Sequence, residues 1–300
     1  MGNVYAASVR QTEAGVTQTQ PLNQAATNEI TFDFVPQTQA LEPFDLRLFT
    51  SPQPAAGSDE TQSSTALARV RTTSPLSRRL LLQPDLEVLP DPERMDAHLA
   101  AALEGDRRVE EQYGRLAVSM IAAAEARQHR RILTISAQSG EGRTCVTLNL
   151  AAALARARRR VLVIDGDLNR PSTLRLLGIS SKAGLAEVLA QRCPLETALI
   201  RVLPFGFHLL PSRERIENPA ELFGDAALSR LLDEADAMYD FILIDAPPLG
   251  GAETQWLARL ADTALLVVSP QRSSARQVLK SLAAFPGEEI AGVLINGLME

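Results

Sequence analysis

Short apolar segments recur along the chain between residues 131 and 296. Nearly all of their positions are hydrophobic, which is typical of strands buried on both faces of a sheet, and the stretches between them have helical spacing. The predicted strands cover 131–136, 161–165, 207–211, 241–245, 264–269 and 292–296, and the predicted helices cover 144–158, 184–191, 219–237, 253–260 and 272–284. Strands alternating with helices predict a three-layer α/β fold, in which right-handed crossovers build a mostly parallel sheet.

The region before the first of these strands divides into three parts. Residues 1–65 are rich in Gln, Thr, Ala, Pro and Ser. Such a segment cannot bury enough apolar surface to offset the entropy of ordering, so we expect a disordered tail. Residues 66–106 are punctuated by proline and arginine and are expected to form a linker with short helices. From 107 to 126 the apolar residues lie on one stripe of a long helix, so we assign 107–300 to a single α/β domain.

Composition narrows the classes of function. The net charge of −6 argues against a general nucleic-acid binder, which normally carries a basic surface. The two cysteines, Cys145 and Cys193, match neither a disulfide framework nor metal-ligand spacing, which indicates a reducing, cytoplasmic setting. No apolar run approaches the roughly 18 residues that a membrane-spanning helix needs. We therefore expect no direct insertion into a membrane.

Polar residues that could carry chemistry follow three of the predicted strands. The first strand leads into "SGEGRT", residues 139–144, in which a glycine-rich turn meets the start of a helix. Such a turn presents backbone N–H groups to an anion. Asp165 and Asp167 follow the second strand and Asp245 ends the fourth. Because ligands bind beyond the carboxyl ends of parallel strands, these groups predict a pocket of the P-loop kind for a magnesium-bound nucleotide.

Two other interpretations of these residues stay open. The glycine turn is also compatible with a tight connection that binds nothing, and an aspartate at a strand end can cap the next helix. Gly140, Gly142 and Cys145 partly match the Gly-x-Gly-x-x-Gly pattern of a dinucleotide-binding fold, with Asp165 at a suitable distance for a ribose contact. That fold does not require Thr144 or Asp167, and its third position is normally Gly or Ala.

With these segments assembled, residues 110–296 resemble the bacterial tyrosine kinases (BY-kinases) of capsule and exopolysaccharide export, the capsule-kinase type of P-loop NTPase. "SAQSGEGRTCVTLNLA" is similar to their Walker A segment, "VLVIDGDLNRPS" to Walker A′ and "YDFILIDAPP" to Walker B. "ENPAELF" and the final "GVLIN" resemble two further family stretches. The resemblance implies a P-loop NTPase fold of the MinD/ParA-like, three-layer kind. MinD and ParA ATPases themselves carry an extra lysine where Gln138 stands, which favours the kinase branch.

The resemblance also implies roles for individual residues. ATP and Mg²⁺ are the expected cofactors, and phosphoryl transfer to tyrosine is the expected reaction. Asp167 corresponds to the catalytic carboxylate, Asp245 to the residue that holds a metal-bound water, and Asn296 to a residue near the base. The implied cofactor-binding residues are Ser139, Gly140, Glu141, Gly142, Arg143, Thr144, Cys145 and Asn296; the implied metal site is Thr144, Asp165 and Asp245; and the implied catalytic residues are Asp167 and Arg143.

The partner implied by the family is the cytoplasmic tail of a membrane polysaccharide co-polymerase, a chain-length determinant that activates the kinase. With no membrane span in its sequence, the chain is expected to be a stand-alone cytoplasmic form, associated peripherally with the inner membrane through that partner. The family also assembles into rings, so a homo-oligomer is a further expectation. We expect no nucleic-acid partner.

Three departures from the family pattern bear on activity. Arg143 stands where a Walker A lysine is expected, and its planar fork does not replace a compact ammonium in a tight phosphate cradle. In the ring-forming Glu-x-x-Arg-x-x-Arg segment, aligned at Glu111, the arginine positions hold Gly114 and Ala117. The C-terminal tyrosine cluster is absent from this sequence. Its tyrosines are Tyr5, Tyr113 and Tyr239.

Three functions therefore remain open on sequence grounds. The first is a non-catalytic or weakly active kinase-like regulator of the export machinery. The second is an active tyrosine kinase for which Arg143 suffices. The third is an ATPase switch of the MinD/ParA kind. The departures favour the regulator, whereas the retained Thr144, Asp165, Asp167 and Asp245 keep the kinase open.

Overall fold

The structure, a computed structural model, describes residues 29–31, 84, 86–97, 99, 107–223, 226–283, 285 and 290–298. The strands are β1 (Glu29–Thr31), β2 (Leu86–Val88), β3 (Arg131–Ser136), β4 (Val161–Asp165), β5 (Ile200–Val202), β6 (Phe207–Leu210), β7 (Phe241–Asp245), β8 (Thr263–Val268) and β9 (Ile290–Leu298). The helices are α2 (Arg107–Arg127), α3 (Arg143–Arg156), α4 (Thr173–Leu177), α5 (Leu185–Leu189), α6 (Leu195–Ala198), α7 (Pro219–Phe223), α8 (Ala226–Asp236), α9 (Ala252–Leu260) and α10 (Ala275–Leu282).

All the described strands belong to one sheet, in the order β1-β9-β8-β3-β7-β4-β6-β5-β2. The six strands from β9 to β6 pair in parallel, as predicted from the buried runs. The antiparallel pairs are β5 with β6 and β1 with β9. The chain passes from β3 toward β4 and β6 on one side and later reaches β8 and β9 on the other. The carboxyl end of β3 therefore lies at a topological switch point, where ligands of such sheets bind.

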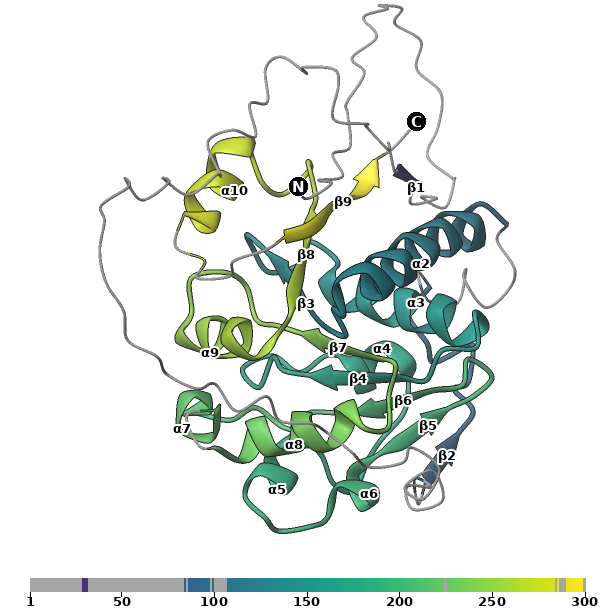
Figure 1. Ribbon diagram of the computed structural model, residues 1–300, viewed down its shortest axis with the longest axis vertical. Coiled ribbons are helices and arrows are strands. Elements are labelled where there is room, and N and C mark those ends of the chain that lie inside the picture. The colour runs from purple at the N-terminus through teal and green to yellow at the C-terminus, as the bar shows by residue number, and fades with distance from the viewer. Residues whose placement is uncertain are drawn as a thin grey trace, which may run out of the picture.

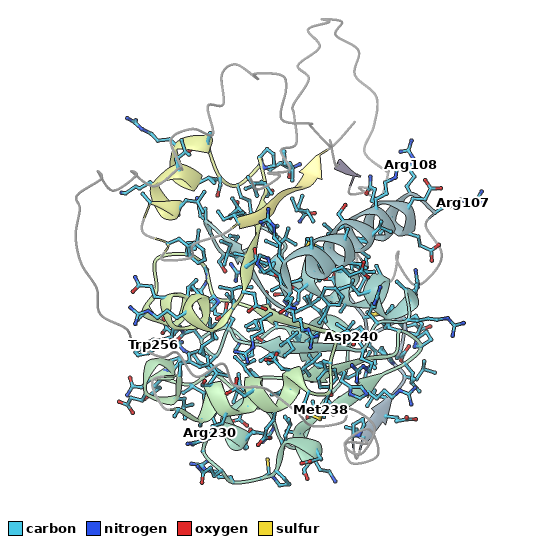
Figure 2. All side chains as sticks on the ribbon, viewed as in Figure 1. Arg107, Arg108, Arg230, Met238, Asp240 and Trp256 are labelled. Atoms are coloured by element: carbon cyan, nitrogen blue, oxygen red, sulfur yellow. The ribbon has the colours of Figure 1, made fainter. Side chains whose placement is uncertain are left out.

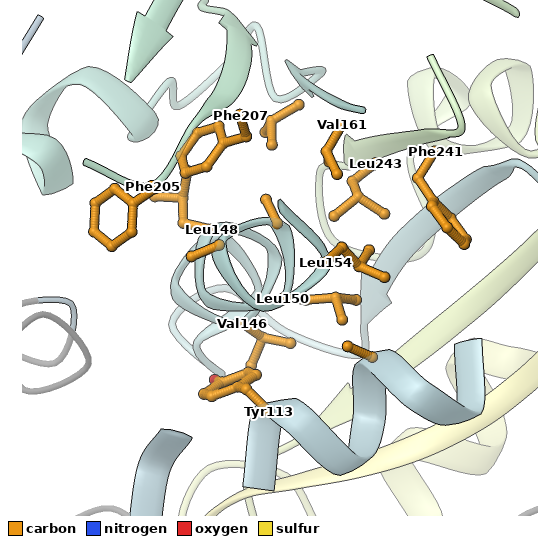
Figure 3. Close-up of a cluster of buried hydrophobic side chains, with 14 of the residues drawn as sticks. Tyr113, Val146, Leu148, Leu150, Leu154, Val161, Phe205, Phe207, Phe241 and Leu243 are labelled. Atoms are coloured by element: carbon orange, nitrogen blue, oxygen red, sulfur yellow. The ribbon is translucent and has the colours of Figure 1, made fainter. Parts of the chain in front are cut away.

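Helices cover both faces of the sheet, which gives the expected three layers (Figure 1). On one face, α3 lies between the sheet and α2. Val146 of α3 packs next to Tyr113 of α2, while Leu154 lies toward Leu243 of β7 (Figure 3). On the other face, α5, α8 and α9 pack on alternate residues of the same strands. Leu154 has no exposed surface, and replacing such a leucine by alanine costs about 2–5 kcal/mol, so this packing holds α3 against the sheet.

Several short elements were not predicted from the sequence. They include β2, β5, α4 and α6, which have three to five residues each and offer too few positions for a periodic pattern. The helix predicted over 219–237 is divided into α7 and α8, with residues 224–225 outside the described part. The predicted tail, 1–65, also lies outside the described residues except for Glu29–Thr31, which pair with β9. The linker prediction over 66–106 is covered only in part.

The described surface exposes few large apolar side chains, and they are scattered. Trp256 on α9, labelled in Figure 2, is 40% exposed. The Arg259 guanidinium lies 5.5 Å from the centre of its ring. Leu86, Leu89 and Val118 are also exposed. Isolated apolar residues of this kind are normal on a protein surface. None of the described helices combines the length and hydrophobicity that crossing a bilayer requires.

Candidate functional site

The turn between β3 and α3 has the backbone shape of an anion-binding loop. Gly140 and Gly142 have φ angles of 83° and 90°, a left-handed conformation that strains other residues. Gly142 is the N-cap of α3, and a Cβ atom there would overlap the side-chain nitrogen of Asn296. The amides in the first turn of a helix have no acceptors within it. Ser139 and Gly140 form an exposed crest, so this loop can present its amides to an anion.

The side chain of Glu141 ties the loop to the neighbouring strands. It is 1% exposed. One carboxylate oxygen accepts a hydrogen bond from the Gln138 amide at 2.7 Å, and the other accepts from the Ser269 amide, just after β8, at 3.1 Å. Its backbone carbonyl accepts from Nδ2 of Asn296 at 2.9 Å. In this structure the Glu141 side chain therefore maintains the shape of the loop, and the Asn296 amide lies against the same turn.

The side chain of Arg143 is directed into the protein, toward the carboxylates. It is 6% exposed. Nη1 donates to Oγ of Ser136 at 2.6 Å, and Nη2 donates to Oδ2 of Asp167 at 3.3 Å. Nε lies 3.9 Å from Oδ1 of Asp245. The charge of this arginine is thus engaged by the acidic residues of the site.

Asp165 is held by the segment that follows it. Its Oδ2 atom accepts three hydrogen bonds, from the Ser172 amide at 3.2 Å, the Thr173 amide at 3.1 Å and the Thr173 hydroxyl at 2.7 Å. Its Oδ1 atom accepts from the Asp167 amide at 3.3 Å. Burial raises the pKa of Asp165 to about 6, although the hydrogen bonds from Thr173 and Ser172 act in the opposite direction. The carboxylate therefore orders the start of α4, and its assignment as a metal ligand stays a prediction.

Asp245 lies beside Asp165 because the two residues are in register on the paired strands β4 and β7. Oδ2 of Asp245 accepts from the Thr144 hydroxyl at 2.6 Å, whereas Oδ1 is buried and has no hydrogen-bond partner among the described residues. Burial raises the pKa of Asp245 to about 7, and Arg143 opposes this shift. Buried polar atoms are normally paired, so an unpaired carboxylate oxygen indicates a position where a ligand can bind.

These groups fit a nucleotide with its magnesium ion. Mg²⁺ is usually held by one or two carboxylates or hydroxyls together with phosphate oxygens and waters. Thr144 and Asp245 offer a hydroxyl and an unpaired carboxylate oxygen side by side, and the α3 amides offer the anion site next to them. Thr144 also lies 2.9 Å from the Ser172 hydroxyl. When bound, the ion would supply positive charge to the phosphate oxygens.

The side chain of Cys145 is directed away from these groups. Its Sγ atom accepts a weak hydrogen bond from Nδ2 of Asn149 at 3.5 Å, and it packs with the hydrophobic cluster between α2 and α3. Burial raises the pKa of the Cys145 thiol to about 12, which keeps it protonated. If Cys145 contacts a nucleotide as predicted, it does so through its backbone amide.

Sequence reasoning missed the hydroxyl residues of the site. Ser136 ends β3 and bonds Arg143, while Ser172 and Thr173 bond Asp165. A weak signal existed for the second pair, because Ser172 follows a proline and directly precedes α4, as helix-start residues often do. Ser136 had no comparable signal, since a serine at the end of an apolar run gives no indication of its partner.

The AAA domain family matches residues 130–285, more than half of the chain. Tyrosine-protein kinase YwqD of Bacillus subtilis is 30% identical over 207 residues, which cover 68% of this chain and 87% of that protein. Tyrosine-protein kinase wzc of Salmonella typhi is 30% identical over 174 residues, which cover 57% of this chain and 24% of that protein. The chain therefore spans most of the first relative and about a quarter of the second.

Solved structures agree with these relatives. The kinase domain of Escherichia coli tyrosine kinase ETK is 29% identical, with a TM-score of 0.62, and the match covers 68% of this chain and 80% of that one. The chimerical protein CapA2B2 has a TM-score of 0.64 at 21% identity, covering 73% of this chain and 96% of that one, and shares the fold. The chain belongs to the AAA domain family and, within it, to the bacterial tyrosine-protein kinases.

Proposed function

We propose that the protein binds ATP and Mg²⁺ and acts as a kinase-like regulator in capsule or exopolysaccharide export, with weak or absent transfer of phosphate to tyrosine. Its membership of the bacterial tyrosine-kinase family supports this proposal. The anion-binding turn and the paired Thr144 and Asp245 support nucleotide and metal binding. The partner is the cytoplasmic tail of a membrane polysaccharide co-polymerase, through which the protein associates with the inner membrane.

The position of Arg143 is the main observation in support of weak or absent phosphate transfer. In the family the corresponding lysine would contact the phosphates. Here the guanidinium lies 3.3 Å from Oδ2 of Asp167, the proposed catalytic carboxylate, and 3.9 Å from Asp245. Phosphoryl transfer depends on positioning and on neutralising charge at the phosphates. A cation that faces the carboxylates instead of the phosphates contributes less to the transition state, and it occupies the carboxylate oxygen that would accept the tyrosine proton.

The test compares the full-length chain with an Arg143→Lys variant. Each is incubated with Mg²⁺ and radiolabelled ATP, a poly(Glu,Tyr) copolymer and a synthetic co-polymerase tail, and phosphotyrosine is measured over time. We expect bound ATP in both proteins, little label from the unmodified chain, and at least about a tenfold gain from Arg143→Lys, equivalent to ~1.4 kcal/mol of barrier. Arg156→Lys, at the other end of α3, is the matched control and should change nothing.

A second function stays in view because Thr144, Asp165, Asp167 and Asp245 come together at one edge of the sheet. If the unmodified chain labels tyrosine well above the no-enzyme background and as fast as Arg143→Lys, the protein is an active tyrosine kinase and the regulator proposal is wrong. ATP hydrolysis without any phosphotyrosine would instead favour a MinD/ParA-like switch. Absence of nucleotide binding at millimolar ATP would exclude the kinase and the switch, and it would contradict the ATP binding that the regulator proposal includes.

A further inference from the structure

Two exposed arginines lie at the crest of the phosphate-binding turn. Nη1 of Arg170 lies 3.4 Å from the Ser139 hydroxyl. The Arg272 guanidinium lies over Gly140, with Nη1 only 3.0 Å from the position that a Cβ atom would take there. Arg170 belongs to the "DLNRP" segment that resembles Walker A′. Arg272 lies in the loop after β8, outside every motif that indicated a nucleotide site.

The backbone around Arg272 is fixed to the turn. Its amide donates to the Ser269 carbonyl at 2.9 Å, and its carbonyl accepts from Nε2 of Gln138 at 3.4 Å. The Ser269 amide in turn donates to Glu141. These contacts keep the β8 loop against the turn between β3 and α3 (the P-loop). The backbone of Arg272 is therefore held beside Gly140.

The Arg272 guanidinium itself is available. Within the described ranges it has no hydrogen bond and no ion pair, and its side chain is exposed. Arg143 is in the opposite situation, because it is buried and pairs with Asp167. Three carboxylates, those of Asp165, Asp167 and Asp245, lie behind the turn. A phosphate chain is negatively charged, so these carboxylates repel it. Its binding is therefore favoured by a cation that is not already paired with a carboxylate.

We propose that Arg272 binds the phosphate chain of the nucleotide from the β8 loop. Arg143 pairs with Asp167, so Arg272 supplies the positive charge that faces the phosphates. This inference rests on the proposed nucleotide binding. An arginine fork forms paired, charge-assisted hydrogen bonds with phosphate oxygens, and such bonds are stronger than neutral ones. The proposal adds a third element to the site, since the β8 loop joins the P-loop and the ends of β4 and β7.

The test measures binding of fluorescently labelled ATP, ADP and AMP to the full-length chain with Mg²⁺. Arg272→Gln should weaken ATP binding about tenfold, as expected for the loss of one charge-assisted contact. The loss should be smaller for AMP, which has one phosphate, and should shrink as salt concentration rises. Arg276→Gln is the matched control, because Arg276 is exposed on the first turn of α10 and its replacement by glutamine removes the same charge.

Three results would overturn the proposal. They are an unchanged ATP affinity in Arg272→Gln, an equal loss of affinity for ATP and AMP, and an effect no larger than that of Arg276→Gln. In each case the unmodified chain still binds ATP, so only the role of Arg272 fails. If the unmodified chain binds none of the nucleotides, the proposed function fails and this inference fails with it. Thermal unfolding of each variant checks that the fold is intact.

Discussion

Two arginines mark the two ends of strand β3, and their surroundings differ. At the amino end, Arg131 donates to both carboxylate oxygens of Asp236, at 3.2 and 2.7 Å, and also to Asp233 and to the Leu260 carbonyl. At the carboxyl end, Arg143 bonds Ser136 and Asp167, but its Nε atom and Oδ1 of Asp245, 3.9 Å apart, have no hydrogen-bond partners among the described residues. The amino end, where Arg131 is saturated with hydrogen-bond partners, is a structural clamp. The carboxyl end is unsaturated, because buried polar atoms there lack hydrogen bonds and can still bind a ligand.

The largest effect is expected from breaking the clamp. Arg131→Ala leaves the 17%-exposed side chain of Asp236 without its bidentate partner, so the free energy of unfolding should fall by about 2–4 kcal/mol. Urea denaturation measures the change. Arg156→Ala, which breaks the exposed pair with Glu110, should cost at most about 0.5 kcal/mol. A loss for Arg131→Ala as small as that would show that the amino end is not a clamp.

A smaller effect of opposite sign is expected at the unsaturated end. Asp245 has a folded-state pKa of about 7 against an ordinary value of 3.8, so the folded protein binds its proton more readily than the unfolded chain. Without Mg²⁺, stability should therefore fall as pH rises from about 4 through about 7. Asp245→Asn removes one buried charge and should reduce this decline, to which Asp165 also contributes, with a gain of about 1 kcal/mol at pH 8.

Thermal unfolding in EDTA across this pH range measures the Asp245→Asn effect, and Asp236→Asn provides the contrast. The Asp236 variant should lose stability at pH 8, because it weakens the clamp. If Asp245→Asn were destabilised at pH 8 by as much as Asp236→Asn, the two ends of β3 would be equivalent and the comparison would fail.

An effect no larger than that of Asp245→Asn in order of magnitude, and opposite in sign, is expected from Ser136→Ala. The Ser136 hydroxyl accepts from Arg143 at 2.6 Å and donates to the Gln138 carbonyl at 2.7 Å, so its loss should cost about 0.5–1.5 kcal/mol. Urea denaturation of Ser136→Ala and Arg131→Ala under the same conditions allows their free energies of unfolding to be compared directly. A cost equal to that of Arg131→Ala would mean that the arginine of the site is as structural as the clamp.

The sequence predicted the sheet well because both faces of its central strands are buried, as in Phe241–Asp245, where every residue is buried. It also predicted that Asp165 and Asp245 meet, because parallel strands place their carboxyl ends at one edge. It could not predict the direction of Arg143, since a long side chain can extend toward phosphate or fold back, and only the positions of Ser136 and Asp167 decide between these. Arg272 was missed because its contact with Gly140 joins loops 132 residues apart in the chain.

The register of β4 against β7 has a consequence for how this sequence can change. Residues directly opposite on neighbouring parallel strands point to the same side of a sheet, and Asp165 and Asp245 are such a pair. One residue inserted within β7 would turn Asp245 to the opposite side and bury its charge among the leucines there. An insertion of the same length after Pro248 would leave the carboxylates together. Tolerance to insertions should therefore change abruptly within a few positions of this strand end.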